Sequence, residues 1–136
     1  MVATKQQNNP FEYCDVLSMS TWKSLRGARG SLIFSNKKSK KDPEIEKKIN
    51  SAVFPTLQGT ASMHQIAGIC SQLGEVCTPA YKEYISQVIS NAKTLGVALE
   101  KKNYEIITQG TENHMILWDF RKTNFHGNTF LFELIH

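Results

Sequence analysis

Three cysteines are the residues of this chain that could most readily bind a metal ion or form a covalent cross-link. Cys14, Cys70 and Cys77 form an odd set with no CxxC spacing, which argues against both a disulfide framework and a zinc site. Cys70 and Cys77 are seven positions apart on one expected helix, about 10 Å along its axis, which is too far for a disulfide. We therefore expect no metal ion and no disulfide.

A run of lysines is the second group that could do chemistry. The chain has 16 basic and 12 acidic residues, and the excess of +4 is concentrated in NKKSKK at residues 36–41. Such a run can bind a phosphate backbone. It has no interleaved aromatic ring for base stacking, and it leads into the acidic start of an expected helix at Asp42. We expect a solvated loop and no nucleic-acid partner, and a steep salt dependence of binding would mark the alternative.

The length and composition are those of one ordinary soluble domain. The chain has 136 residues, of which 40% are hydrophobic and 21% charged, and a domain of this size buries about two-thirds of its unfolded surface. No apolar run reaches the roughly 18 residues of a membrane-spanning helix. The first ten residues, MVATKQQNNP, have neither a secretory apolar region nor an Arg-rich transit pattern. We expect a cytoplasmic location and no membrane partner.

The order of strand-like and helix-like segments predicts an α/β fold. Two strands, at residues 13–20 and 31–34, flank a turn of glycine and arginine near residues 27–30. Two further short strands are expected at residues 104–108 and 114–120, separated by a segment of turn-forming residues.

Three helices are expected between these pairs of strands. The first is short, with Asp42 as its cap and Pro55 as its end. The second, over residues 63–77, has one apolar stripe, which we expect to be buried: Met63, Ile66, Cys70, Leu73 and Cys77. The third, over residues 79–102, keeps the same alternation from Tyr81 to Leu99 and is the strongest of the three.

Three strings in the chain carry more information than this pattern. They are FEYCDVLSMSTWKSLRGARGSLIF at residues 11–34, INSAVFPTLQGTASMHQIAG at residues 49–68 and YEIITQGTENHMILWDFR at residues 104–121. In this order and spacing they resemble the serine hydroxymethyltransferase family, and their residues are most similar to those of plant members. The helix TPAYKEYISQVISNAKTLG also matches. The resemblance covers about residues 9–121 and is that of a truncated, divergent fragment.

The resemblance implies a fold and a reaction. The fold is a partial fold-type I pyridoxal-phosphate transferase: residues 9–78 would be the C-terminal part of the large domain, and residues 79–121 the long helix and first strands toward the small domain. Residues 1–8 would be a disordered tail and residues 122–136 a divergent one. The family interconverts serine and glycine with tetrahydrofolate, using pyridoxal 5'-phosphate as cofactor. A homo-oligomer, or a hetero-oligomer with a full-length relative, is implied as well.

The resemblance also implies site residues. Lys23 matches the lysine that bonds to the cofactor aldehyde, and such an attack needs a neutral amine, which burial and neighbouring cations favour. Asn113 matches an asparagine near the folate. The remaining implied positions line the cofactor or its phosphate: Ser20, Thr21, Arg29, Gly59 and Thr60. Without the resemblance, each of these is an ordinary strand, turn or surface residue.

Departures from the family pattern point the other way. Trp22 stands where the family has histidine, and an indole can donate a hydrogen bond but cannot exchange a proton. Thr60 stands where a family glycine approaches the phosphate, and a β-branched side chain disfavours a positive φ there. The family's acidic partner for the ring nitrogen and its phosphate loop precede the first string, and its carboxylate-binding arginine follows the last. We expect this chain alone to be catalytically incomplete, and the alternative is a non-catalytic module that pairs with a full-length relative.

Overall fold

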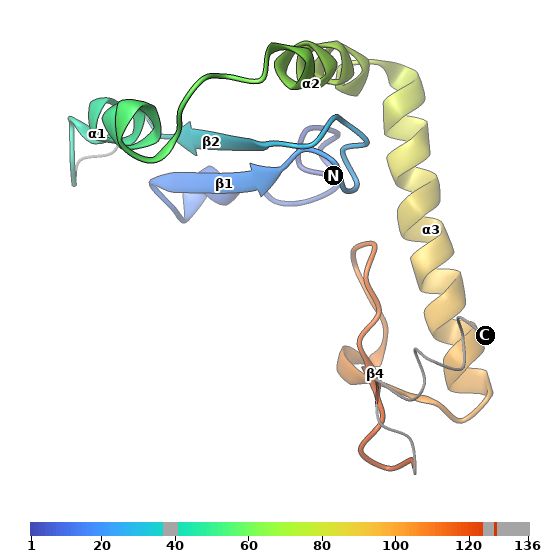
Figure 1. The fold of residues 1–136 in the computed structure, drawn as a ribbon. Coiled ribbons are helices and arrows are strands. Elements are labelled where there is room, and N and C mark those ends of the chain that lie inside the picture. Colours follow the sequence, from blue (N-terminus) through green and yellow to red (C-terminus); the bar gives the residue numbers. More distant parts are fainter. Residues whose placement is uncertain (37–40, 124–126, 128–136) are drawn as a thin grey trace. The chain divides into compact units, whose positions relative to one another are not determined.

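The computed structural model describes residues 1–36 and 41–123, together with Gly127. The basic run at residues 37–40 and most of the predicted tail at residues 122–136 lie outside this part. The chain divides into two compact units, Met1–Lys82 and Glu83–His136, whereas the sequence predicts a boundary between residues 78 and 79. Both helices and strands are present, so the mixed α/β character is confirmed (Figure 1).

An antiparallel hairpin is the centre of the first unit. β1 (Val16–Ser20) pairs with β2 (Ser31–Ser35) in a register that sets Leu17 opposite Phe34 and Met19 opposite Leu32. The two predicted strands are thus present, but β1 begins later than expected because the N–H groups of Tyr13 and Cys14 both donate to the carbonyl of Pro10 in a turn that follows the 3-10 segment Pro10–Glu12. The connection between the strands is the whole loop 21–30 and not the tight turn that the glycines suggest.

A cavity of about 400 Å³ lies on the apolar face of this hairpin. The strands line it with four apolar side chains: Leu17, Met19, Leu32 and Phe34. Residues 1–3 and the end of the helix that contains Leu73 and Val76 also line it. Residues 1–8, where the sequence predicts a disordered tail, form turns in which the buried Thr4 donates its hydroxyl to the carbonyl of Met1.

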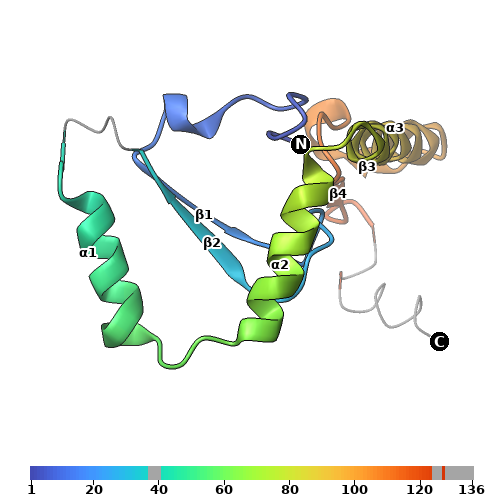
Figure 2. The ribbon, with the colours of Figure 1, turned by 90° about the horizontal axis from the view of Figure 1, so that it is seen from above.

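The helices of the first unit begin after the basic run. α1 (Ile45–Ser51) is followed by the segment Ala52–Leu57, in which Phe54, directly before Pro55, is extended with a φ of −137° and a ψ of 129°. The predicted cap is wrong: the helix begins after Glu44, which occupies the cap position without a side-chain hydrogen bond, and Asp42 instead accepts from the backbone N–H of Glu44 at 3.1 Å in the turn before the helix. α2 (Met63–Val76) follows and lies across the end of the hairpin where the loop joins the strands (Figure 2).

The face that α2 buries differs from the predicted one. Met63 is 71% exposed and Ile66 48% exposed, and both cysteines of the predicted stripe are exposed too. The most buried side chain of α2 is Gln72. The stripe prediction is wrong because the neighbour of α2 is a loop of small residues, against which a face of glycine and amide packs more closely than large apolar side chains.

α3 (Pro79–Lys101) begins in the first unit and continues in the second, close to the predicted bounds. In the second unit Ile85 and Ala92 are buried as its alternation predicts, while Leu95 is 54% exposed. β3 (Glu105–Ile106) pairs antiparallel with β4 (Trp118–Asp119). These strands are shorter than predicted, since Thr108 adopts a φ of 69° in a 3-10 turn directly after β3.

Aromatic rings pack around the short β3–β4 pair. The ring centroids of Tyr104 and Trp118 are 4.5 Å apart, and those of Trp118 and Phe120 are 4.8 Å apart. Such pairs stabilise by about 0.5–1.5 kcal/mol beyond the area that they bury. In the described part of the chain, no helix is both long and apolar enough for a membrane crossing.

Candidate functional site

Lys23 lies on the loop 21–30, and Thr21 closes the base of this loop. The Thr21 side chain is fully buried, and its hydroxyl donates to the carbonyl of Ala28 at 2.6 Å. Its backbone N–H donates to the carbonyl of Gly30 at 3.0 Å, and its own carbonyl accepts from the N–H of Gly27 at 2.8 Å. Three hydrogen bonds from one residue therefore fix both ends of the segment that carries the lysine.

A second set of contacts fixes the turn that begins at Lys23. The N–H of Arg26 donates to the carbonyl of Lys23 at 2.9 Å, and Arg26 has a φ of 63°. The hydroxyl of Tyr81, a residue only 3% exposed, donates to the carbonyl of Ser24 at 3.1 Å. The guanidinium of Arg26 lies 5.7 Å from the centre of the Tyr81 ring. The start of α3 thus holds the backbone directly after the lysine.

Helix α2 supports the loop from the other direction, as its position in Figure 2 shows. A Cβ atom built on Gly68 would lie 2.9 Å from the Cβ of Ala28, and one built on Gly30 would lie 2.8 Å from Cδ1 of Ile69. Real Cβ atoms do not approach so closely, so Gly68 is required for this packing, whereas at Gly30 the end of the Ile69 side chain could shift. The loop is therefore pressed against α2 over its second half.

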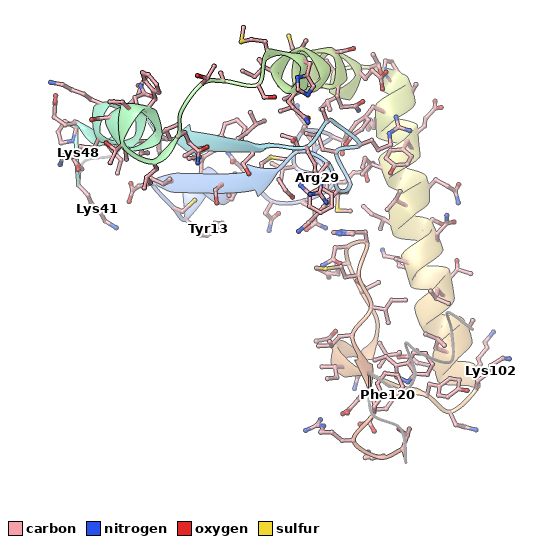
Figure 3. All side chains as sticks on the ribbon, viewed as in Figure 1. Tyr13, Arg29, Lys41, Lys48, Lys102 and Phe120 are labelled. Atoms are coloured by element: carbon pink, nitrogen blue, oxygen red, sulfur yellow. The ribbon has the colours of Figure 1, made fainter. Side chains whose placement is uncertain are left out.

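The exposed side of the loop presents two cations on one aromatic ring. Trp22 is 45% exposed, and the Nζ of Lys23 lies 5.7 Å from the centre of its ring. The guanidinium carbon of Arg29 lies 4.7 Å from the same centre. Figure 3 shows the labelled Arg29 at the loop end of the hairpin. An exposed primary amine with a neighbouring guanidinium is thus held on a loop whose backbone is fixed from two directions.

This pair of groups fits one side of the cofactor implied above. A primary amine can bond to an aldehyde, and a guanidinium attracts an anionic group such as a phosphate. The carboxylates with ion pairs in the described part of this unit serve other cations, as for Glu75, 3.6 Å from Arg26, and Asp15, 3.5 Å from Lys41. The residues present fit the lysine side of a pyridoxal-phosphate site.

The other predicted cofactor residues fall into two places. Ser20 ends β1 opposite Ser31, so it lies beside the lysine loop along with Thr21 and Arg29. The hydroxyl of Thr21 already donates to Ala28, so it serves the loop itself. Gly59 and Thr60 are exposed in the segment before α2. A Cβ built on Gly59 meets no heavy atom within 4 Å, and both residues have a negative φ, so neither backbone conformation requires glycine.

Asn113 belongs to the second unit and shapes a loop there. Its Oδ1 accepts a hydrogen bond from the N–H of Met115 at 2.7 Å and from the hydroxyl of Thr111 at 3.3 Å. The loop around it, residues 108–117, lines an open cavity of about 740 Å³. The carbonyl oxygen of Asn113 is therefore used in the turn, which agrees with the turn-forming role that its residue type suggests.

A closely spaced ion pair, Asp119 with Arg121, lies near the end of the third string. Asp119, which is 6% exposed, accepts hydrogen bonds from the backbone and the guanidinium of Arg121, at distances from 2.6 to 3.0 Å. These hydrogen bonds lower the pKa of Asp119 from 3.8 to about 2. The pair joins two neighbouring residues, so it stabilises the chain after β4 and offers no base or acid for catalysis.

Sequence reasoning missed the residues that hold the lysine loop in place. Tyr81 is predicted as part of a buried helical stripe, but its hydroxyl bond to Ser24 spans 57 positions of sequence. Gln72 packs beside Gly27 without lying on the apolar stripe of α2. The one available signal was the occurrence of small residues in both segments, Gly27 to Gly30 in the loop and Gly68 in the helix.

Comparison with known proteins gives one consistent result. A family model described as serine hydroxymethyltransferase matches residues 1–134, which extends beyond residues 9–121, the part that resembles the family by its motifs. The chain is 49% identical over 127 residues to serine hydroxymethyltransferase of Plasmodium falciparum, with 93% of this chain and 28% of that protein covered.

Two further relatives agree. Serine hydroxymethyltransferase 4 of Arabidopsis thaliana is 47% identical over 137 residues, covering 94% of this chain and 29% of that protein. Serine hydroxymethyltransferase of Rickettsia prowazekii is 48% identical over 127 residues, covering 93% and 29%. The chain thus spans less than a third of the length of the curated relatives that it matches.

Proposed function

The chain belongs to the serine hydroxymethyltransferase family, and on that premise we propose that it provides the lysine-bearing part of a pyridoxal-phosphate site of fold type I. The proposed reaction is the transfer of a one-carbon unit between serine and tetrahydrofolate, with glycine as the other product. Serine, glycine and tetrahydrofolate are accordingly the proposed small-molecule partners, and the cytoplasm is the proposed location.

One observation carries this proposal. Lys23 lies at the matching position of the family string, and it projects from a loop that Thr21 closes and that Tyr81 and α2 hold. When bound, the cofactor would supply an aldehyde for the lysine and an electron-withdrawing ring for the substrate. In this chain the lysine would hold the aldehyde and Arg29 would supply positive charge beside it. Both roles need a fixed backbone, which the loop has.

We propose that the polypeptide of these 136 residues does not complete the reaction by itself. The chain covers 28% of the length of its relative from Plasmodium falciparum. The Glu75 carboxylate in the first unit is already paired with Arg26. A pyridoxal-phosphate enzyme needs an acidic group at the ring nitrogen to make the ring an electron sink. Purified chain with cofactor, serine and tetrahydrofolate should yield no glycine above the cofactor-only background, and sustained glycine formation would contradict this part of the proposal.

Substitution of the lysine tests the cofactor-binding part. Pyridoxal phosphate should give a saturable visible absorbance band with the wild-type chain. The variant Lys23→Gln should lose the saturable component, since the amine that bonds to the aldehyde is gone. Lys93→Gln is the matched control, because Lys93 is an exposed lysine on the second unit's part of α3. Equal saturable bands in Lys23→Gln and Lys93→Gln would refute the assignment.

A second candidate function is a non-catalytic module that pairs with a full-length relative, or with a second copy. The observation that favours it is the exposure of large apolar side chains in the first unit: Phe54 at 63%, Leu57 at 76% and Met63 at 71%. Several large apolar side chains exposed within ten residues of sequence are typical of an interface. These residues surround Gly59 and Thr60, which the family resemblance places near a cofactor phosphate.

Co-expression tests this second candidate. A tagged chain should co-purify with an untagged full-length family member if pairing is its role. The variant Leu57→Glu should abolish co-purification, since a carboxylate would be buried in the interface. Leu95→Glu is the matched control on the second unit, because Leu95 is also exposed, at 54%. Retention of the partner by Leu57→Glu would refute an interface at this surface.

A further inference from the structure

The ring of Trp22 contacts both cationic groups of the lysine loop. The Nζ of Lys23 is 5.7 Å from the ring centre and the Cζ of Arg29 is 4.7 Å from it. Both distances are within the roughly 6 Å over which the negative face of an indole attracts a cation. Tryptophan is the strongest of the aromatic residues in this interaction. Both side chains therefore lie at cation–π distance from one ring.

The loop backbone places Trp22 and Arg29 near each other. Trp22 directly follows Thr21, which is fully buried, and Arg29 lies between Ala28 and Gly30, whose carbonyls accept hydrogen bonds from Thr21. The same hydrogen bonds of Thr21 therefore set the Cα positions of Trp22 and Arg29. The two distances also place the two positive charges within about 10 Å of each other, near the screening length at 0.1 M ionic strength. The ring offsets part of their mutual repulsion.

We propose that Trp22 restrains Lys23: the contact between the lysine and the ring must be given up before the amine can attack, so the ring lowers the rate at which the lysine reacts with an aldehyde. An ammonium has no lone pair for attack on a carbonyl, so a lysine held in contact with the ring is less available as a nucleophile. Trp22 is a positioning residue in this scheme, since it acts through the lysine. The inference deepens the proposed function, and it rests on that function for the biological role of Lys23 but not for the reactivity itself.

The restraint predicts opposite effects for the two residues around the ring. Removal of the indole takes away the contact that Lys23 must give up, so the lysine should react faster. Removal of the Arg29 charge takes away a neighbouring cation and leaves the ring to Lys23 alone, so the lysine should react more slowly. A general loosening of the loop would change both variants in the same direction.

Reductive methylation with formaldehyde and cyanoborohydride measures this reactivity without pyridoxal phosphate. The rate at Lys23 is followed by peptide mass spectrometry in the 136-residue chain, relative to the exposed Lys93 in the same sample. The variant Trp22→Leu should raise this ratio about two- to fivefold, the range that cation–π contacts give at exposed sites. Trp22→Phe should raise it by less, and it serves as the test if the leucine variant does not fold.

Two further variants make the outcome decisive. Tyr13→Leu is the matched control, since Tyr13 is an exposed aromatic residue at 79%, and it should leave the ratio unchanged. Arg29→Gln should lower the ratio. An unchanged or lower ratio in both Trp22 variants, or a change in Tyr13→Leu as large as in Trp22→Leu, would overturn the inference. A raised ratio together with unselective labelling by pyridoxal phosphate would keep the inference and refute the proposed function.

Discussion

Replacement of Thr21 by valine tests whether this residue holds the lysine loop. The side chain is fully buried, and its hydroxyl donates to the carbonyl of Ala28 at 2.6 Å. Valine has nearly the same shape but has a methyl group in place of the hydroxyl. The variant therefore loses one hydrogen bond and leaves the Ala28 carbonyl without that donor, while packing is preserved.

The expected loss follows from the cost of leaving a partly buried acceptor, the Ala28 carbonyl, without its donor. Breaking such a bond on one side costs about 1–3 kcal/mol of the free energy of unfolding. Thr94→Val is the matched control. The hydroxyl of Thr94 also donates to a backbone carbonyl, that of Ser90 at 2.9 Å, but on the exposed surface of α3. Water replaces that donor at once, so the free energy of unfolding should change by less than about 0.5 kcal/mol.

Urea unfolding of the three proteins provides the measurement. With slopes of about 1–3 kcal/mol per molar urea, Thr21→Val should unfold at a midpoint lower by about 1 M, with its slope unchanged. Thr94→Val should unfold with the wild type. The reasoning about the loop would be refuted by equal midpoints for the two valine variants. The folded Thr21→Val protein should also lose selectivity for Lys23 in cofactor labelling, since the segment that carries the lysine is no longer closed.

Two other predictions concern packing and charge. Gly68→Ala should lower the free energy of unfolding by about 1–3 kcal/mol, since its Cβ would lie 2.9 Å from that of Ala28. Gly74→Ala is the control: its Cβ would meet nothing within 4 Å, so this variant should raise the free energy of unfolding by about 1 kcal/mol in the same urea titration. Equal effects of the two substitutions would argue against the packing of α2 on the loop. Asp119 has a folded pKa of about 2, below its ordinary 3.8, so its pairing with Arg121 stabilises the fold fully above about pH 4 and less as the pH falls toward 2. Asp119→Asn should flatten this acid limb in unfolding measured against pH, and a limb as steep as that of the wild type would contradict the pairing.

Much of the fold could be predicted from local pattern. The alternation from Tyr81 to Leu99 gave α3 nearly to the residue, because a long amphipathic repeat needs no knowledge of its partner to be recognised. The hairpin strands were found for a similar reason, since β-branched and apolar residues flank a glycine-containing segment.

The elements that pack on one another could not be predicted in this way. The face that α2 buries depends on the surface it meets, and that surface is the loop of small residues at Gly27 and Gly30. The apolar stripe of α2, with Met63 and Ile66, is left exposed in the described structure. A sequence pattern shows which side chains are apolar, but which of them are covered is settled by the partner.

The candidate site shows the same division. Lys23 was found because its string resembles a family, since a single lysine has no pattern of its own. The contacts that fix its backbone come from Tyr81 and from α2, which are distant in sequence. The contact of two cations with Trp22 could not be predicted either, because the position of Arg29 beside the ring depends on how the loop folds back.

Mapping of the covalently bound cofactor tests the central claim most directly. The chain is mixed with pyridoxal phosphate, reduced with borohydride, digested and analysed by mass spectrometry. The account predicts label concentrated on Lys23 at low cofactor excess, with exposed lysines such as Lys93 labelled only at high excess. Label spread over the surface lysines in proportion to their exposure, with no preference for Lys23, would contradict it.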